Sequence, residues 1–296
     1  MSKKAIIIVN PVAGKMNIRK DLPNMLVTLK AQDYETKVYT TKARGDASKV
    51  AEKFGRTRDL VVCCGGDGTL NEVISGLLKI DEKPLLLYYP CGSTNDFAAT
   101  LGLSRDPVEA AADIENREVM ELDIGMFNNE LNFSYIASFG LFVKASYSAS
   151  QKVKNILGHF AYILEGAKEL PNIGKSYRTK IVYDGGVIKG DYALVGVTNS
   201  TSAGGVLKLS KDDVSLSDGL FEVLLIKGIK CPKDLAETAK LLLAKKTDGD
   251  RVTLIHTSKV HIECKDNPEW CTDGEFAGRY TSVDAECLHG AVRILI

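Results

Sequence analysis

Short apolar runs alternate with helical patterns over the first 125 residues of the chain. Strands are predicted over 5–10, 60–64 and 85–89, because each segment is a short, largely apolar run, and a further strand is predicted over 37–41. Apolar residues recur at helical spacing over 19–30, 46–54 and 70–78, and a further helix is predicted from about Asp96. Buried strands that alternate with helices are typical of a parallel, doubly wound sheet. We therefore predict an α/β domain over 1–125.

Strand patterns follow one another directly after about Leu122. They cover 131–138, 179–183, 187–189, 192–198, 221–226, 252–257 and 260–264, and Asp184-Gly185-Gly186 gives a hairpin turn between two of them. Helices are predicted over 151–170 and 232–246. This pattern predicts a mainly antiparallel β domain over 126–289. The last strand, 292–296, fits either domain from its sequence alone.

Composition and charge limit the possible partners. The 296 residues are 45% hydrophobic and 26% charged, which suits a compact globular protein. Lys+Arg and Asp+Glu both number 38, so no net field favours nucleic acid, and none is predicted as a partner. We expect no membrane span, because the chain lacks an apolar run of about 18 residues. The seven cysteines have no C-x-x-C spacing, and with no signal peptide expected they favour a cytoplasmic location.

Three segments that follow predicted strands carry candidate phosphate-binding chemistry. The first runs from Asn10 to Lys15, where Pro11 and Gly14 favour a tight turn and Lys15 can reach a phosphate. It is not a Walker A loop, because Val9 and Met16 stand where that motif needs glycine and a hydroxyl residue. An ordinary surface loop with a lysine remains an equal alternative.

The second segment, Gly65 to Glu72, contains three glycines before a predicted helix. Glycines let the backbone approach a ligand closely, and a helix N-terminus favours a phosphate. Asp67 is informative because a carboxylate beside phosphates repels them unless a cation lies between, which indicates Mg²⁺. The alternative is that Asp67 only caps the helix. Asn71 stands where a dinucleotide-binding fingerprint would have its third glycine.

The third segment runs from Pro90 to Ala98. Gly92 permits another close backbone approach, and the hydroxyl of Ser93 or Thr94 can bond a phosphate. Asn95 and Asp96 can equally serve as caps of the following helix.

The blocks GGDGTLNE and PCGSTNDFA together resemble the diacylglycerol kinase catalytic domain family of lipid kinases. The resemblance extends to the opening VNPVAGK, to 216–220 and to 272–275, and so covers the full length. It implies an N-terminal α/β domain like that of NAD kinases and a C-terminal antiparallel, β-sandwich-like domain, with the active site in the cleft between them. It also implies that the last strand, about 290–296, returns to the first domain.

Matching the blocks position by position implies a set of nucleotide-contacting residues. These are Asn10, Pro11, Val12, Ala13, Gly14, Thr41, Gly66, Asp67, Gly68, Thr69, Leu70, Asn71, Glu72, Ser93 and Glu275. Ser93 departs from the family, where most members have threonine. The resemblance also implies a structural Mg²⁺ bound by the Asp218 carboxylate and the main-chain oxygens of Ser215 and Leu220. From the residues alone, Asp218-Gly219 reads as a turn. The segment that precedes Asp218 departs from the family, because residues 211–213 are Lys-Asp-Asp where the family usually has Ala-Pro.

The resemblance also implies the catalytic residues. Asp273 matches the family's catalytic base, and Asp123 matches an aspartate linked to it and to the metal. Asp67 would act through Mg²⁺ and water on the phosphates of ATP. A purely structural turn at Asp273-Gly274 is the alternative reading of that motif.

The resulting hypothesis is an ATP- and Mg²⁺-dependent kinase that phosphorylates diacylglycerol or a similar lipid to give phosphatidic acid or an analogue. Its lipid substrate implies transient contact with the inner face of the membrane, and the relatives imply a homodimer. The predicted helix over 151–170 carries lysines beside apolar residues, so it suits membrane docking or simple packing on the β domain. The competing hypotheses are an NAD kinase-like enzyme and a catalytically silent nucleotide- or lipid-binding regulator.

Overall fold

The computed structural model describes residues 2–14, 18–92, 95–141, 175–203, 207–210, 212–247 and 249–296. The chain divides into two compact units, one of Met1–Leu122 with His289–Ile296 and one of Asp123–Leu288. Ser93 and the predicted helix over 151–170 lie outside the described residues. Within the described ranges, no helix is long and apolar enough to cross a membrane.

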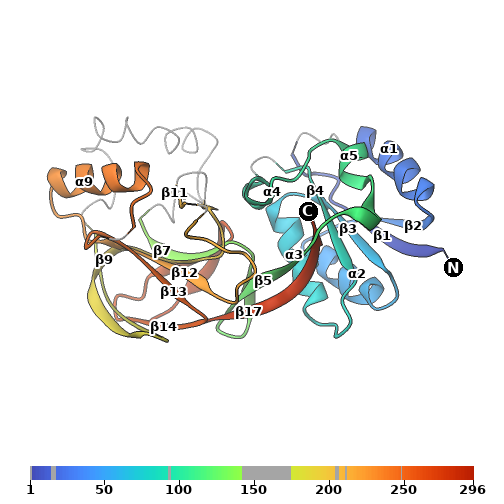
Figure 1. The fold of residues 1–296 in the computed structure, drawn as a ribbon. Coiled ribbons are helices and arrows are strands. Elements are labelled where there is room, and N and C mark those ends of the chain that lie inside the picture. Colours follow the sequence, from blue (N-terminus) through green and yellow to red (C-terminus); the bar gives the residue numbers. More distant parts are fainter. Residues whose placement is uncertain are drawn as a thin grey trace. The chain divides into compact units, whose positions relative to one another are not determined.

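The first unit is a parallel sheet in the order β17-β4-β3-β1-β2 (Figure 1). Its strands are β1 (Lys3–Val9), β2 (Tyr34–Thr40), β3 (Leu60–Gly65), β4 (Leu85–Pro90) and the end of β17 (Ser282–Leu295). The last strand lies parallel to β4, with Ile294 opposite Leu86. The helices are α1 (Ile18–Ala31), α2 (Asp46–Gly55), α3 (Asp67–Leu77), α4 (Asp96–Leu101) and α5 (Pro107–Ala111), followed by a 3₁₀ turn over Ile114–Asn116.

Helices cover both faces of this sheet, which explains why its strands are unbroken apolar runs. Ile7, Val62 and Leu87 pack with Met25 of α1 and Ala111 of α5 on one face. α2 and α3 contact β1 and β3 and pack against each other. The predicted doubly wound parallel sheet is confirmed.

The strand β2 begins earlier than its sequence pattern predicts. It starts at Tyr34, three residues before the predicted 37–41 segment, and it is an edge strand. Tyr34 is buried, but the positions that follow are mostly exposed or half-buried and polar. An edge strand of this kind carries no continuous apolar run, so its start could not be recognised.

The second unit is antiparallel. Its main path runs β16-β15-β7-β9-β8-β14-β17, and β12 pairs with β9 and β13. The strands are β5 (Val119–Phe127), β6 (Leu131–Phe133), β7 (Ile136–Gly140), β8 (Tyr177–Tyr183), β9 (Gly186–Thr198), β10 (Ser202–Ala203), β11 (Leu207–Lys208), β12 (Phe221–Lys227), β13 (Val252–Thr257), β14 (Lys259–Cys264), β15 (Glu269–Thr272), β16 (Glu275–Arg279) and the start of β17. The predicted antiparallel β-rich region is confirmed.

Several strand boundaries of the second unit differ from the prediction. The segment 131–138 is two strands, β6 and β7, and the segments 187–189 and 192–198 form the single strand β9. The pattern also missed β5, β15, β16 and the start of β17. β5 and β17 mix exposed and buried positions, β16 has no buried position, and β15 is buried but only four residues long. The apolar signal of these strands is therefore weak. The helix predicted over 232–246 is α9 (Pro232–Leu243) and ends three residues earlier.

Aromatic rings fix the region around β7 and β15. Trp270 of β15 is buried, and its ring lies 4.8 Å from the ring of Phe139 and 5.2 Å from that of Phe127, centroid to centroid. Both contacts are edge-to-face, a geometry that stabilises aromatic pairs. β15 is thereby held beside β7, and the turn that follows β15 is held with it.

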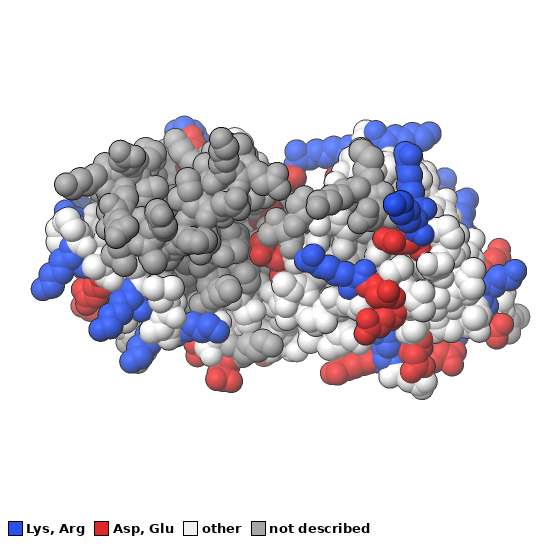
Figure 2. Space-filling model, turned by 90° about the horizontal axis from the view of Figure 1, so that it is seen from above, with Lys and Arg blue, Asp and Glu red and all other residues white. Residues whose placement is uncertain are grey.

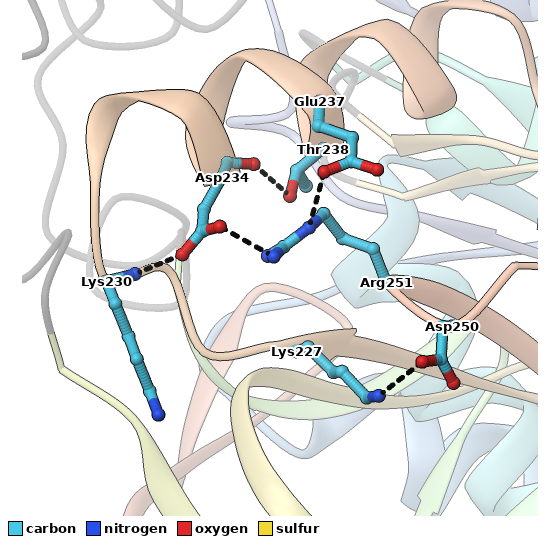
Figure 3. A network of polar contacts seen from close by, with 7 residues as sticks. All are labelled: Lys227, Lys230, Asp234, Glu237, Thr238, Asp250 and Arg251. Atoms are coloured by element: carbon cyan, nitrogen blue, oxygen red, sulfur yellow. Dashed lines mark hydrogen bonds and ion pairs between the residues drawn. The ribbon is translucent and has the colours of Figure 1, made fainter.

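The helix α9 is attached to the sheet by Arg251, which directly precedes β13 (Figure 3). The Arg251 guanidinium donates to Asp234 at 2.7 Å and to Glu237 at 3.3 Å. The other Asp234 carboxylate oxygen accepts the Lys230 N–H at 2.8 Å, just before the helix begins. One arginine therefore pairs with both acidic side chains of α9.

The surface carries both signs of charge. On the first unit, at the right of Figure 2, basic and acidic side chains are interspersed over the visible face. This mixture agrees with the equal numbers of basic and acidic residues in the chain. Among the described residues of this face, no large patch of a single sign of charge is present that would attract a polyanion.

Candidate active site

The loops after β1 and β4 touch at the carboxyl end of the parallel sheet. Gly14 has a φ of +53°, and a Cβ placed there would lie 2.2 Å from the Cys91 carbonyl oxygen. A side chain at this position would be strained and would also collide with backbone. The sequence uses glycine here because the two loops approach each other so closely.

The loops after β3 and β4 also meet through glycines. A Cβ on Gly92 would lie 2.5 Å from the Cα of Gly66. The buried Asn95 amide donates to the Gly92 carbonyl at 2.8 Å and fixes the loop from the other side. Three loops thus form one surface of backbone beside the N-terminus of α3, where N–H groups are left outside the helical ladder.

Asn10 joins this surface to the first turn of α3. Its amide donates to the Thr69 hydroxyl at 2.8 Å, and its side-chain oxygen accepts the Val12 N–H at 3.1 Å. Thr41 lies at the end of β2, and its N–H donates to the Val9 carbonyl at 2.9 Å. The structure therefore brings Asn10, Thr41 and Thr69 to the same edge of the sheet.

Asp67 binds the start of a different helix from its own. Its carboxylate accepts the N–H groups of Asp96 at 3.2 Å and Phe97 at 3.3 Å, in the first turn of α4. The cap position of α3 is Gly66, and no side chain caps it. Burial raises the pKa of Asp67, and the backbone N–H groups oppose this only in part. The carboxylate is thus a costly charge that a nearby cation would stabilise.

Glu72 holds the loop that follows Thr41. Its carboxylate accepts the Gly45 N–H at 2.8 Å and the Ala47 N–H at 3.3 Å, at the start of α2. Gly45 has a φ of +82°, in the left-handed region. The described contacts of Glu72 position a neighbouring loop, and its contact with a nucleotide stays a prediction.

The other predicted nucleotide residues differ in exposure. Leu70 is fully buried and Ala13 nearly so, whereas Val12 is 70% exposed. Leu70 can therefore face a ligand only through its backbone. Pro11 and Asn71 are half-buried, and Gly68 is exposed at the start of α3.

Asp273 is fixed by three backbone donors. Its carboxylate accepts the N–H groups of Ser134 at 2.6 Å, Tyr135 at 3.0 Å and Ile136 at 3.1 Å. It has a φ of +48° and lies with Gly274 in the turn between β15 and β16. Three donors suit an ionised carboxylate, which only accepts hydrogen bonds. The same bonds account for the break between β6 and β7, while Glu275 follows as the exposed first residue of β16.

Asp123 is buried and holds the segment that contains Asp218. Its carboxylate accepts the Gly219 N–H at 2.6 Å, and its N–H donates to the Leu216 carbonyl at 2.8 Å. The Asn199 amide donates to the Asp123 carbonyl at 2.8 Å. Asp123 therefore positions this loop through both its side chain and its backbone.

The segment predicted to bind a structural cation forms a turn. Asp218 is exposed, and its carboxylate accepts the Leu220 N–H at 3.0 Å. This turn matches the reading of Asp218-Gly219 from the residues alone. In the described part of the chain, no group of three or more His, Cys, Asp or Glu side chains could hold a metal. A cation here would need main-chain oxygens, such as those of Ser215 and Leu220.

Glu222 is a buried carboxylate that the sequence reasoning did not single out. It lies in the apolar strand β12 and has no exposed surface. Burial, with the nearby Asp218 charge, raises its pKa to about 8. The signal was present in the sequence, because a glutamate interrupts the apolar run 221–226.

Known protein families match both parts of the chain. Residues 4–127 match the diacylglycerol kinase catalytic domain, and residues 136–296 match the YegS C-terminal NAD kinase beta sandwich-like domain. A diacylglycerol kinase of Bacillus subtilis (strain 168) is 34% identical over 278 residues, which cover 93% of this chain and 91% of that protein. A diacylglycerol kinase of Staphylococcus aureus (strain bovine RF122 / ET3-1) is 34% identical over 94% of this chain and 88% of its own length.

Solved structures give the same result. The crystal structure of a diacylglycerol kinase from Bacillus anthracis str. Sterne has a TM-score of 0.75 at 26% identity, covering 99% of this chain and 96% of that one. A second crystal structure from this organism has a TM-score of 0.82 at 28% identity, covering 99% and 95%. With its motifs, its fold and these relatives in agreement, the chain belongs to the diacylglycerol kinase family of lipid kinases.

Proposed function

We propose that the protein transfers the γ-phosphate of ATP to the free hydroxyl of diacylglycerol, with Mg²⁺, and so forms phosphatidic acid. The observation that carries the proposal is the backbone surface formed by the loops after β1, β3 and β4. It lies at the start of α3, where a triphosphate finds N–H donors and the positive end of a helix. The names of the relatives support diacylglycerol as the acceptor.

The residues of the first unit would bind and orient the donor nucleotide. The N–H groups at Gly66 and Gly68 would hold the triphosphate, with Asn10 and Thr69 fixing the adjacent loop. A bound Mg²⁺ would supply positive charge against the phosphate oxygens. Asp67 fits such a cation, because burial raises the pKa of its carboxylate and the backbone N–H groups around it offset this only in part. It would hold the cation through water.

In the second unit, Asp273 would act as the general base. As the lipid hydroxyl oxygen bonds to the γ-phosphorus, the bond from that phosphorus to the bridging oxygen breaks and ADP leaves. The hydroxyl proton passes to the Asp273 carboxylate. The three N–H groups on this carboxylate support the role, because they hold it in one orientation.

A structural Mg²⁺ bound by Asp218 and the carbonyls of Ser215 and Leu220 would stiffen the loop that Asp123 holds. The Asp123–Gly219 hydrogen bond supports this, because it joins a predicted catalytic residue directly to the proposed cation loop. Since the acceptor is a membrane lipid, we also propose that the protein works at the cytoplasmic membrane surface.

A lipid-panel assay tests the proposed function. Purified protein is given γ-labelled ATP with diacylglycerol, sphingosine, a prenyl alcohol or NAD in otherwise identical detergent micelles. We expect label in phosphatidic acid with diacylglycerol, and none with Asp273→Asn. Label in NADP alone would instead support the NAD kinase-like hypothesis. No turnover with any acceptor would support a silent regulator.

A further inference from the structure

Glu222 is the second residue of β12, which lies between β9 and β13 in the second unit (Figure 1). It lies opposite Thr198 of β9 on one side and His256 of β13 on the other. Its side chain has no exposed surface. A glutamate in this position needs a compensating group, because an uncompensated buried carboxylate costs several kcal/mol.

The segment 213–220 lies next to this carboxylate and is held at several points. The Asp213 carbonyl oxygen lies 2.8 Å from the His256 Nε2 atom. The Leu216 carbonyl and the Gly219 N–H both bond to Asp123. This loop therefore has a defined position close to Glu222.

Oxygen acceptors outnumber donors where the loop meets β12. Neither carboxylate oxygen of Glu222 has a hydrogen-bond partner among the described residues. The Ser215 N–H lies near this carboxylate and stabilises its charge only in part, because the pKa of Glu222 is still raised. The His256 Nε2 atom is 4.0 Å away, beyond hydrogen-bond length. The side-chain oxygen of Asn199 is a further buried acceptor without a partner in the described part of the chain.

We infer that the Glu222 carboxylate is a ligand of a hard divalent cation bound between β12 and the segment 213–220. Carboxylate and carbonyl oxygens are the ligands that Mg²⁺ and Ca²⁺ prefer. A cation would balance the buried charge of Glu222 and the adjacent charge of Asp218 together. The inference rests on the cation site proposed at Asp218, and it adds a buried ligand on a rigid strand to that exposed turn.

This arrangement gives the cation a positioning role. It would tie the Asp218 turn to β12, while the Gly219 N–H of the same turn holds the carboxylate of Asp123. Losing the Glu222 ligand would leave the turn attached only by its exposed carboxylate and main-chain oxygens. Asp123 would then lose the fixed orientation of its hydrogen-bond donor.

The competing explanation is that a proton neutralises Glu222. Glu222→Gln separates the two explanations, because an amide resembles a protonated carboxyl but is a much poorer cation ligand. The full chain, treated with a chelator and free of nucleotide, is titrated with Mn²⁺ and followed by electron paramagnetic resonance. Thermal unfolding with Mg²⁺ gives a second readout that does not depend on activity.

We expect wild-type protein to bind one Mn²⁺ per chain, and Glu222→Gln to bind it at least about tenfold more weakly. Glu222→Asp, which keeps the charge, should recover part of the affinity. The matched control is Glu286→Gln, since Glu286 is 43% exposed and pairs with Lys259. It should bind Mn²⁺ like wild type.

Two results would overturn the inference, and they differ. If Asp218→Asn abolishes Mn²⁺ binding while Glu222→Gln leaves it unchanged, the proposed cation site stands but Glu222 is no ligand. If wild type binds no Mn²⁺ without nucleotide, the structural cation of the proposed function also fails. The metal-free melting temperature of Glu222→Gln shows whether that variant folds. We expect it to equal or exceed that of wild type, because a buried charge has been removed.

Discussion

The two units hold their key carboxylates in different ways. In the parallel unit, Asp67 accepts two long backbone hydrogen bonds, of 3.2 and 3.3 Å. In the antiparallel unit, Asp273 accepts three, of 2.6, 3.0 and 3.1 Å. The Asp273 carboxylate thus has three close backbone donors, whereas burial still raises the pKa of Asp67 despite the backbone N–H groups around it. Close backbone donors suit the proposed role of Asp273 as a base that keeps one orientation. A raised pKa suits the proposed role of Asp67 as a carboxylate that a cation stabilises.

The units also assemble their sites differently. A parallel sheet brings the ends of successive strands to one edge, so the loops near Gly14, Gly66 and Gly92 meet by topology alone. The antiparallel unit instead joins distant segments by strand pairing. Cys271 of β15 lies opposite Ser138 of β7, and this pairing brings the turn at Asp273 to the N–H groups that begin at Ser134.

The largest expected effect tests the fixed carboxylate. Asp273→Asn should lower turnover by about 10² or more, because the general base is lost. It should also lower the free energy of unfolding by about 2 kcal/mol, since an amide group would face three N–H donors with only one acceptor oxygen. Lipid phosphorylation and urea unfolding measure the two effects.

The control for this prediction is Asp250→Asn, because the Asp250 side chain is fully exposed and should tolerate the change. Near wild-type phosphorylation by Asp273→Asn would remove Asp273 from the mechanism. The three hydrogen bonds of Asp273 would then have a structural role only.

The next effect tests the backbone surface of the parallel unit. Gly14→Ala should raise the KM for ATP by about tenfold or more, since its Cβ would push the loop after β4 away. Gly102→Ala is the matched control. Gly102 also has a positive φ, of +68°, but nothing lies within 4 Å of its added Cβ. Equal KM values for the two variants would show that loop contact does not shape the ATP site.

A smaller effect tests the uncompensated charge of Asp67. Its pKa is raised in the folded protein, so the charged carboxylate lowers the free energy of unfolding. This destabilisation is absent below the unfolded pKa of about 4 and grows as pH rises through the folded pKa. Nucleotide-free Asp67→Asn should therefore melt at or above the wild-type temperature at pH 7. The difference should shrink toward pH 4.

Asp46→Asn serves as a control of opposite sign in the same unit. The Lys42 and Ala43 N–H groups lower the pKa of Asp46, so its stabilising effect is present at pH 7 and is lost as pH falls through the lowered folded pKa. This variant should melt below wild type at pH 7. If the melting temperatures of both variants shift in the same direction at pH 7, burial does not govern the pKa of Asp67.

The smallest effect concerns the ion pairs of α9. Arg251→Ala should lower the free energy of unfolding by about 1 kcal/mol, because a half-buried arginine leaves Asp234 and Glu237 unpaired. Lys227→Ala is the control, since its partner Asp250 is fully exposed. Kinase activity should not change in either variant. If Arg251→Ala loses kinase activity while its free energy of unfolding is unchanged, α9 contributes to catalysis and not only to stability.

The sequence alone determined the fold class and most of the regular elements of both units. Unbroken apolar runs marked β1, β3 and β4, because strands covered on both faces carry no polar positions. A mixed pattern hid β5, short length hid β15, and the lack of buried positions hid β16. The edge strand β2 lost its first residues. Exposure alone did not decide the outcome, because the partly exposed β13 has the bounds that its pattern predicted.

The sequence also marked the loops that carry candidate chemistry, because glycines and polar residues at strand ends are local features. Only the tertiary structure decided what those residues contact. Glu72 bonds Gly45 across 27 positions, and Asp273 bonds Ser134 across 139. It also decided that Glu222 lies buried beside the loop at Asp218. Local patterns indicate that a segment is buried, but they do not show which distant residues its polar groups contact, because those contacts join segments far apart in the chain.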